Sequence, residues 1–73
     1  MGIPVVDWFK PGEYVAVDHH KRDVCGSLLP MYLWYEHFKV VRYDPVNGQD
    51  CFLLRSRDNR DFCFNVNAIN KVV

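Results

Sequence analysis

The chain has 73 residues, and its nine Lys and Arg residues balance its nine Asp and Glu residues, so the formal net charge at neutral pH is zero. A protein that binds many phosphates needs a basic excess, so this balance argues against dedicated or sequence-specific nucleic-acid binding. The length predicts a single domain over residues 1–73. No apolar run approaches the roughly 18 residues of a membrane-spanning helix, and the chain start lacks the basic and apolar regions of a secretory signal. We therefore expect a cytoplasmic protein without a membrane segment.

The first part of the chain predicts one strand. Residues 1–10, MGIPVVDWFK, are too apolar for a loose tail, and the Pro-Gly pair that follows them is a turn signal. Residues 13–18, EYVAVD, alternate in polarity and are rich in Val and Tyr, which is typical of a strand. The alternation predicts that Val15 and Val17 point inward.

Residues 19–33 predict a long loop. They begin with the polar run HHKRDVCGS and continue into LLPMYLWYEHF, which is apolar almost throughout and is interrupted by a proline. A helix over residues 31–38 would present apolar side chains on every side, which a domain of this size could hardly bury. We expect one helical turn near residues 28–33, followed by a strand over residues 34–43. Loops of this length are uncommon and are often functional.

The stretch over residues 38–66 predicts a three-stranded antiparallel meander. Its short apolar runs are separated by the turn clusters DPVNG and RDNR. Pairing across the first turn places Phe38 and Val40 on one face, because side chains alternate with a period of two. Phe52 and Leu54 fall on the same face, which is therefore expected to form the core.

Two pairings are possible across the second turn. A three-residue turn brings Leu54 opposite Phe64 and Phe52 opposite Val66. A two-residue turn would place Cys63 on the core face instead. The apolar pattern favours the three-residue turn.

The order of the predicted elements is that of an SH3-like barrel. After the meander, residues 67–70 predict a tight helical turn and residues 71–73 a short closing strand. We therefore expect a mainly β protein, a small and partly open SH3-like barrel with a long first loop and a short helical turn near the C-terminus. The N-terminal decapeptide is an addition that a minimal barrel does not need.

The cysteines and histidines predict neither a metal site nor a catalytic centre. Zinc sites carry close ligand pairs such as Cys-x2-Cys, whereas Cys25, Cys51 and Cys63 are separated by 25 and 11 residues. We expect three free thiols in a reducing compartment. A pair of Cys25 with His19 or His20 lacks an orienting third group, and the chain has no phosphate loop, nucleophile elbow or paired-carboxylate motif. We therefore expect no metal, no cofactor and no enzymatic activity.

The aromatic interval Tyr32, Trp34 and Tyr35 is the best candidate for a partner-binding surface. Trp, Tyr and Arg dominate the binding energy of protein interfaces, and Arg42 and Arg55 are expected nearby across the sheet. The sequence therefore predicts a partner site made of these five residues. The alternative is a core role, in which Tyr35 faces inward while Tyr32 and Trp34 cap the barrel rim.

Four arginines of the meander give a second candidate, a local basic patch of Arg42, Arg55, Arg57 and Arg60. In the segment RSRDNR, acidic and amide residues alternate with the arginines, so a solvated turn with balanced charge is one interpretation. The other interpretation is a surface that faces phosphates in a nucleic-acid-binding barrel. Salt dependence separates the two classes, because phosphate binding weakens steeply as the salt concentration rises.

The whole chain, from MGIPVVDWF through LPMYLWYEHFKVV to its last residue, resembles the small RNA polymerase-binding transcription regulators of lytic Xanthomonas phages. Length and overall sequence character carry the resemblance, and no motif assigns a role to a single residue. The resemblance implies binding to the N-terminal segment of the β′ subunit of the host polymerase, with the β subunit as a further contact. It also implies inhibition of initiation through interference with the σ factor, and antitermination. We expect a monomer in the cytoplasm of the bacterial host.

Overall fold

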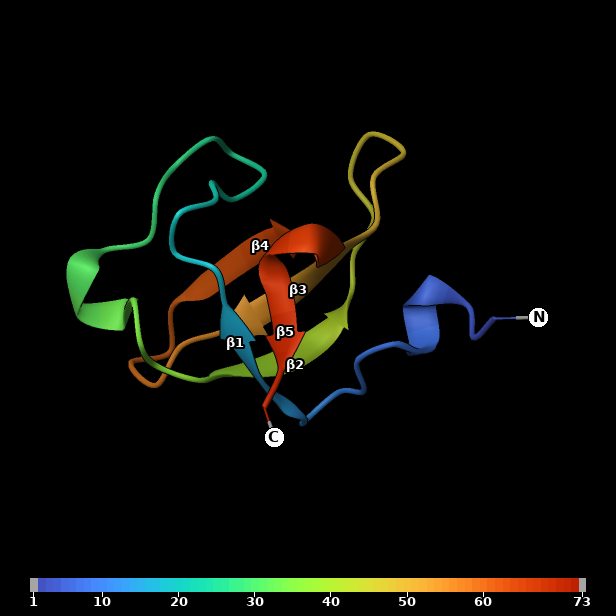
Figure 1. Ribbon diagram of the computed structural model, residues 1–73, viewed down its shortest axis with the longest axis horizontal. Helices are drawn as coiled ribbons and strands as arrows, with labels where there is room; N and C mark the ends of the chain where they lie inside the picture. The colour runs from blue at the N-terminus through green and yellow to red at the C-terminus, as the bar shows by residue number, and fades with distance from the viewer. Residues whose placement is uncertain (1, 73) are drawn as a thin grey trace.

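The computed structural model describes residues 2–72 and contains one antiparallel sheet of five strands in the order β4-β3-β2-β1-β5 (Figure 1). The strands are β1 (Tyr14–Val17), β2 (Phe38–Tyr43), β3 (Cys51–Arg55), β4 (Asp61–Asn65) and β5 (Ile69–Lys71). The 3₁₀ turns that accompany them are η1 (Val5–Asp7), η2 (Met31–Leu33) and η3 (Val66–Ala68). Within the described part of the chain, no helix is long and apolar enough to cross a membrane.

The expected mainly β, SH3-like architecture is confirmed. Strands β2, β3 and β4 form the predicted meander, and β1 and β5 cross in front of it in Figure 1, so that the open sheet curls into a partly open barrel. The long loop between β1 and β2 projects to one side of this barrel, and the N-terminal segment projects to the other. The short helical turn near the C-terminus is η3, which joins the two edge strands, β4 and β5.

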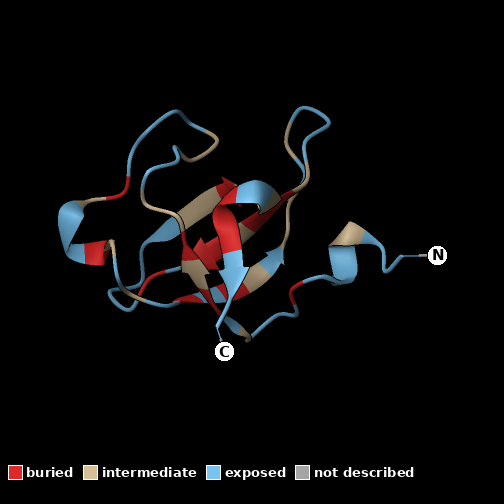
Figure 2. Ribbon diagram, in the orientation of Figure 1, coloured by how far each residue is buried: buried red, intermediate tan, exposed pale blue. Residues whose placement is uncertain are grey.

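The core lies inside the curled sheet and draws apolar side chains from every strand (Figure 2). Val15 and Val17 of β1 point inward as predicted, and both are buried. Phe9 closes one end of the barrel, with its ring edge-on to Phe52 at 5.2 Å between centroids. The most fully buried apolar side chains are Val15, Leu33, Phe38, Val40, Cys51, Phe52, Leu54 and Phe64.

The predicted pairing across the first turn is confirmed, since Val40 lies opposite Leu54 and the expected core residues are buried. The tip of this hairpin is the Asn-Gly pair, with Asn47 at φ 50° and Gly48 at φ 78°. Positive φ at both central positions is the geometry of a turn that matches the twist of the flanking strands. A β-bulge between Val40 and Arg42 then shifts the register by one residue, which the alternation in the sequence did not predict.

The predicted pairing across the second turn is wrong. Phe52 lies opposite Phe64, and Leu54 lies opposite Phe62. The turn has the expected three residues but lies one residue earlier in the chain, at 57–59, because Ser56 closes it: its N–H donates to the carbonyl of Arg60, and its hydroxyl accepts the Arg60 N–H. The error amounts to two residues, so every side chain keeps the face that the alternation predicts.

The loop between β1 and β2 is longer than predicted, because β2 begins at Phe38 and not near residue 34. The expected helical turn is η2, whose backbone is set by Pro30 at φ −55°. A further bond from the Glu36 N–H to the Leu33 carbonyl, at 3.2 Å, continues the turn beyond η2. Trp34 and Tyr35 therefore form a turn and are not part of a strand.

The elements after β4 begin earlier than the sequence suggests. The side chain of Asn65 accepts the N–H of Asn67 and caps η3, which starts at Val66. Strand β5 then starts at Ile69, directly after the turn. The last residue of the expected closing strand, Val73, lies outside the described residues.

Candidate functional site

Four large apolar side chains on η2 or close to it in the chain stay exposed in the long loop. Met31 and Tyr35 are 72% and 83% exposed, and Leu28 and Tyr32 are each about half exposed. We call these four residues the η2 surface. Large aromatic and Met side chains that stay in solvent at this level are the residue types that dominate protein interfaces.

A stack of rings lies beside Tyr35, one of the residues of the η2 surface. The His19 ring lies flat on the Trp34 ring, with centroids 4.4 Å apart and planes 13° apart, and Tyr35 meets His19 edge-on at 5.4 Å. Trp34 packs partly against the core, and its indole N–H donates to the Leu29 carbonyl at 3.0 Å. Trp34 is therefore a support for the surface, while Tyr35 is its exposed face.

The alternative core role does not hold for Tyr35. This side chain faces solvent and not the core. The 3₁₀ turn η2 and the turn that follows it replace the extended backbone here, and Tyr32 and Tyr35 are both exposed. A strand would have alternated every two residues, which is the period assumed for the inward orientation of Tyr35.

Tyr32 fastens η2 to the turn between β3 and β4. Its hydroxyl donates to the Asp58 carboxylate at 2.5 Å and accepts from the Arg60 guanidinium at 3.1 Å. Beside it, Arg57 forms an ion pair with Glu36 at 2.6 Å. The two Tyr32 contacts join residues 26 and 28 positions apart in the chain, and together with the ion pair they hold η2 against the barrel.

The Asp58 contacts predict a loss of stability in acid. Hydrogen bonds from the Ser56 hydroxyl and then the Tyr32 hydroxyl lower the pKa of Asp58 from its ordinary value of 3.8. A lowered folded pKa means that the bonds stabilise the protein above the ordinary value, and that this contribution is lost as the pH falls through the folded pKa. We expect the unfolding midpoint in denaturant to drop in this acid range, and Asp58→Asn to remove that part of the drop. Asp7→Asn leaves the bonds intact and should retain it; equal profiles for both variants would contradict the role of Asp58.

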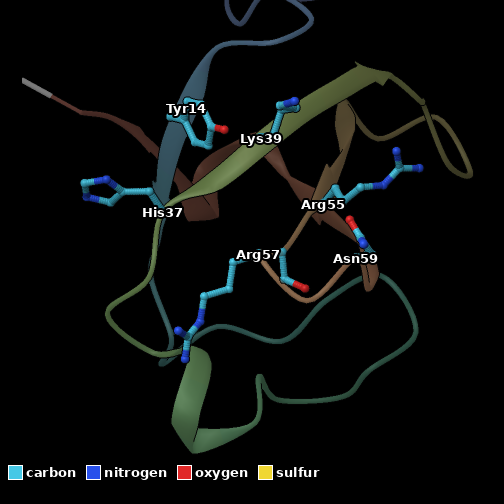
Figure 3. A pocket seen from close by; sticks show the side chains of 7 residues that line it. Tyr14, His37, Lys39, Arg55, Arg57 and Asn59 are labelled. Atoms are coloured by element: carbon cyan, nitrogen blue, oxygen red, sulfur yellow. The ribbon is translucent and has the colours of Figure 1, made fainter.

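A basic hollow of about 180 Å³ lies at the ends of β1, β2 and β3 (Figure 3). Its strand residues belong to the face of the sheet that points away from the core. Cross-strand pairing builds it, because Tyr14 lies opposite Lys39 and Lys39 lies opposite Arg55. The next residue along this row, Asp61 of β4, binds Arg55 at 2.8 Å, and this bond lowers the pKa of Asp61. The residues that line the hollow are Tyr14, His37, Lys39, Arg55, Ser56, Arg57 and Asn59.

The predicted partner site and the predicted arginine patch do not each form one cluster. In the described part of the chain, neither Arg42 nor Arg55 makes a hydrogen bond, ion pair or cation–π contact with the three aromatic residues of the expected site. Arg42 is exposed and close enough to Asp61 to contribute to its lowered pKa. Arg60 lies over the Phe62 ring at 5.4 Å, away from the hollow lining.

Sequence reasoning missed Lys39, His37 and Tyr14 as members of a common site. Lys39 and Tyr14 come from different strands, and only the pairing of β1 with β2 brings them together. The signal that could have found them is the alternation itself, which puts Lys39 and Arg55 on the face opposite the core once the first hairpin is paired.

The three thiols are free. Cys51 is fully buried and Cys25 is exposed, while burial raises the pKa of the Cys63 thiol to about 11. Among residues 2–72, no three His, Cys, Asp or Glu side chains gather in a way that could hold a metal ion.

Alkylation is expected to separate the thiols, since only a thiolate reacts quickly. With iodoacetamide at mildly alkaline pH, Cys25 should react fast, while Cys51 and Cys63 react only as the fold opens. Mass spectrometry of the intact protein over time measures this, and Cys25→Ser should abolish the fast phase. Rapid modification of a second thiol in the folded protein would contradict the burial of the strand cysteines.

Comparison with known proteins adds no relative: no protein-family model, curated protein or solved structure matches the chain.

Proposed function

We propose that this chain is a non-enzymatic transcription regulator that acts in the cytoplasm of a bacterial host by binding RNA polymerase. The partner segment is the N-terminal segment of the β′ subunit, with the β subunit as a further contact, as the resemblance in the sequence implies. Binding there interferes with the σ factor, inhibits initiation and favours antitermination.

The observation that carries the binding role is the η2 surface. Met31 and Tyr35 keep about three quarters or more of their area in solvent, although a small domain gains stability by burying such side chains. The surface is held in place by the ring stack and by the bond from Tyr32 to Asp58, so little order has to be gained on binding. A rigid, apolar patch of this kind suits a protein partner.

A titration with a β′ N-terminal fragment tests the proposal. We expect the parent chain to bind, and the double variant Met31→Ala/Tyr35→Ala to bind at least about tenfold more weakly, as loss of exposed hot-spot side chains does. Ile3→Ala is the matched control, because Ile3 is an equally exposed apolar residue on the N-terminal segment. Calorimetry or fluorescence anisotropy gives the dissociation constants, and thermal melting confirms that all variants are folded.

The outcomes are separable. No binding by the parent chain would refute the polymerase proposal. Binding by the parent with unchanged affinity in the double variant would move the interface away from the η2 surface. Stable binding at raised salt is expected as well, because the proposed interface is apolar and not built on phosphates.

The alternative function, nucleic-acid binding by Arg42, Arg55, Arg57 and Arg60, has less support, because these side chains have different surroundings. Arg60 is bound by Tyr32 and Phe62, and Arg42 stands apart from the hollow. Arg55 and Arg57 alone share a feature, the basic hollow.

A further inference from the structure

The lining of the basic hollow is unusual for a chain with no net charge. It contains three cations, Lys39, Arg55 and Arg57, together with His37. Asp61 pairs with Arg55 and Glu36 pairs with Arg57 from outside the lining, so Lys39 is the cation that gives the site its positive excess. A concave, water-accessible site with several cations attracts an anion, because a curved basic surface concentrates the potential.

Lys39 lies at the upper edge of the lining in Figure 3. It stands between Tyr14 and Arg55 in the row of paired strands, and Figure 3 shows its side chain between theirs. Among residues 2–72, no carboxylate lies within ion-pair distance of Lys39. Its ammonium group is thus free to bind an anion from solution.

The two arginines are held in place with donors to spare. Asp61 binds Arg55 at 2.8 Å, and Glu36 binds Arg57 at 2.6 Å. A guanidinium has five N–H donors, so one carboxylate leaves others available while it restricts the side chain. The Arg57 side chain is still 67% exposed in this pair. The carboxylates therefore orient the arginines without closing the hollow.

Tyr14 indicates which anion fits. Its ring is half exposed at the rim of the hollow, directly beside Lys39. A flat aromatic ring next to a cation binds a phosphate and its neighbouring base together, which is how proteins bind single strands. A carboxylate of an acidic peptide would use the cations but would leave the ring without a partner.

We propose that the basic hollow binds single-stranded nucleic acid, with a phosphate on Lys39 beside its cross-strand neighbour Arg55, an adjacent base stacked on Tyr14, and Arg57 available to another phosphate further along the strand. The strand is single because a base within a duplex has no free face for the ring. Binding is weak and independent of base sequence, since phosphate contacts and stacking carry no base code. This site goes beyond the proposed polymerase binding and does not depend on it.

A fluorescein-labelled oligo-dT of about ten nucleotides, a length within the range that one small barrel covers, is the probe. Anisotropy titrations of the full chain at several salt concentrations should show binding with a negative slope of log affinity against log salt of about 0.7 for each phosphate bound. Lys39→Gln should weaken binding about five- to tenfold and reduce the slope by about 0.7. Tyr14→Ala should weaken binding about tenfold and leave the slope unchanged, because stacking releases no counterion.

Lys21→Gln is the matched control, because it removes the same charge at a loop position where Lys21 binds the Asn67 carbonyl, at the opposite end of β1 from Tyr14. Three results would overturn the proposal: no binding of oligo-dT at low salt, equal weakening by Lys21→Gln and Lys39→Gln, or displacement of the oligonucleotide by an oligo-glutamate peptide at equal concentration. Polymerase is absent from this assay, so its failure leaves the β′ titration unaffected.

Discussion

Replacing Phe64 by alanine is expected to unfold most of the protein at room temperature. Phe64 is fully buried on β4, opposite the fully buried Phe52 of β3. Removing a buried Phe ring costs about 3–5 kcal/mol, because the transfer free energy and the new cavity both count. A chain of this length has a free energy of unfolding of roughly 5 kcal/mol. Circular dichroism in urea should therefore show a variant with little or no folded baseline.

Phe62→Ala is the matched comparison for Phe64→Ala. Phe62 lies two residues earlier on the same strand and face but is only partly buried, with its ring 6.0 Å from that of Phe38. We expect a cost of about 1–2 kcal/mol and a clear, cooperative unfolding transition. If Phe62→Ala were as damaging as Phe64→Ala, the arrangement of β4 against the core would be wrong.

Trp34→Ala is expected to be the second most damaging change, and to weaken partner binding without direct contact. The indole packs against the core, bonds to Leu29 and carries the His19 ring. Partial burial lowers the cost of the truncation to about 2–3 kcal/mol. Without the indole, the His19 ring has no partner to stack on, and Tyr35 then loses the ring that it meets edge-on. Chemical unfolding measures the first effect, and the β′ titration of the still-folded fraction measures the second.

Tyr35→Ala provides the contrast for Trp34→Ala. Tyr35 is 83% exposed, so its loss should change the unfolding free energy by at most about 1 kcal/mol while it weakens binding. A Trp34→Ala protein of parental stability would show that Trp34 is a surface residue and not a support. The two variants thus separate the residues that build the surface from those that touch a partner.

The sequence predicts those elements of this fold that are set by residues close together in the chain. The strand over residues 13–18 and the first hairpin were predictable, because alternation and an Asn-Gly turn are encoded within a few residues. The position of the second turn was not, since it depends on Ser56 and Arg60 closing the turn through the Ser56 hydroxyl. The predicted start of β2 was too early, because the apolar run before Phe38 fits a strand and a turn equally well.

The sequence by itself determined the mainly β fold, the inward faces of β1 and the meander, and the core residues on them, because these follow from the period of the side chains along the chain. Only the tertiary structure decided which aromatic residues are exposed and which cations share a hollow. Tyr32 is fixed by Asp58, a partner 26 residues away, and Lys39 meets Tyr14 only through strand pairing. Such contacts form between segments that are distant in the chain. The pattern of residues along the chain does not show which of these segments lie side by side after folding.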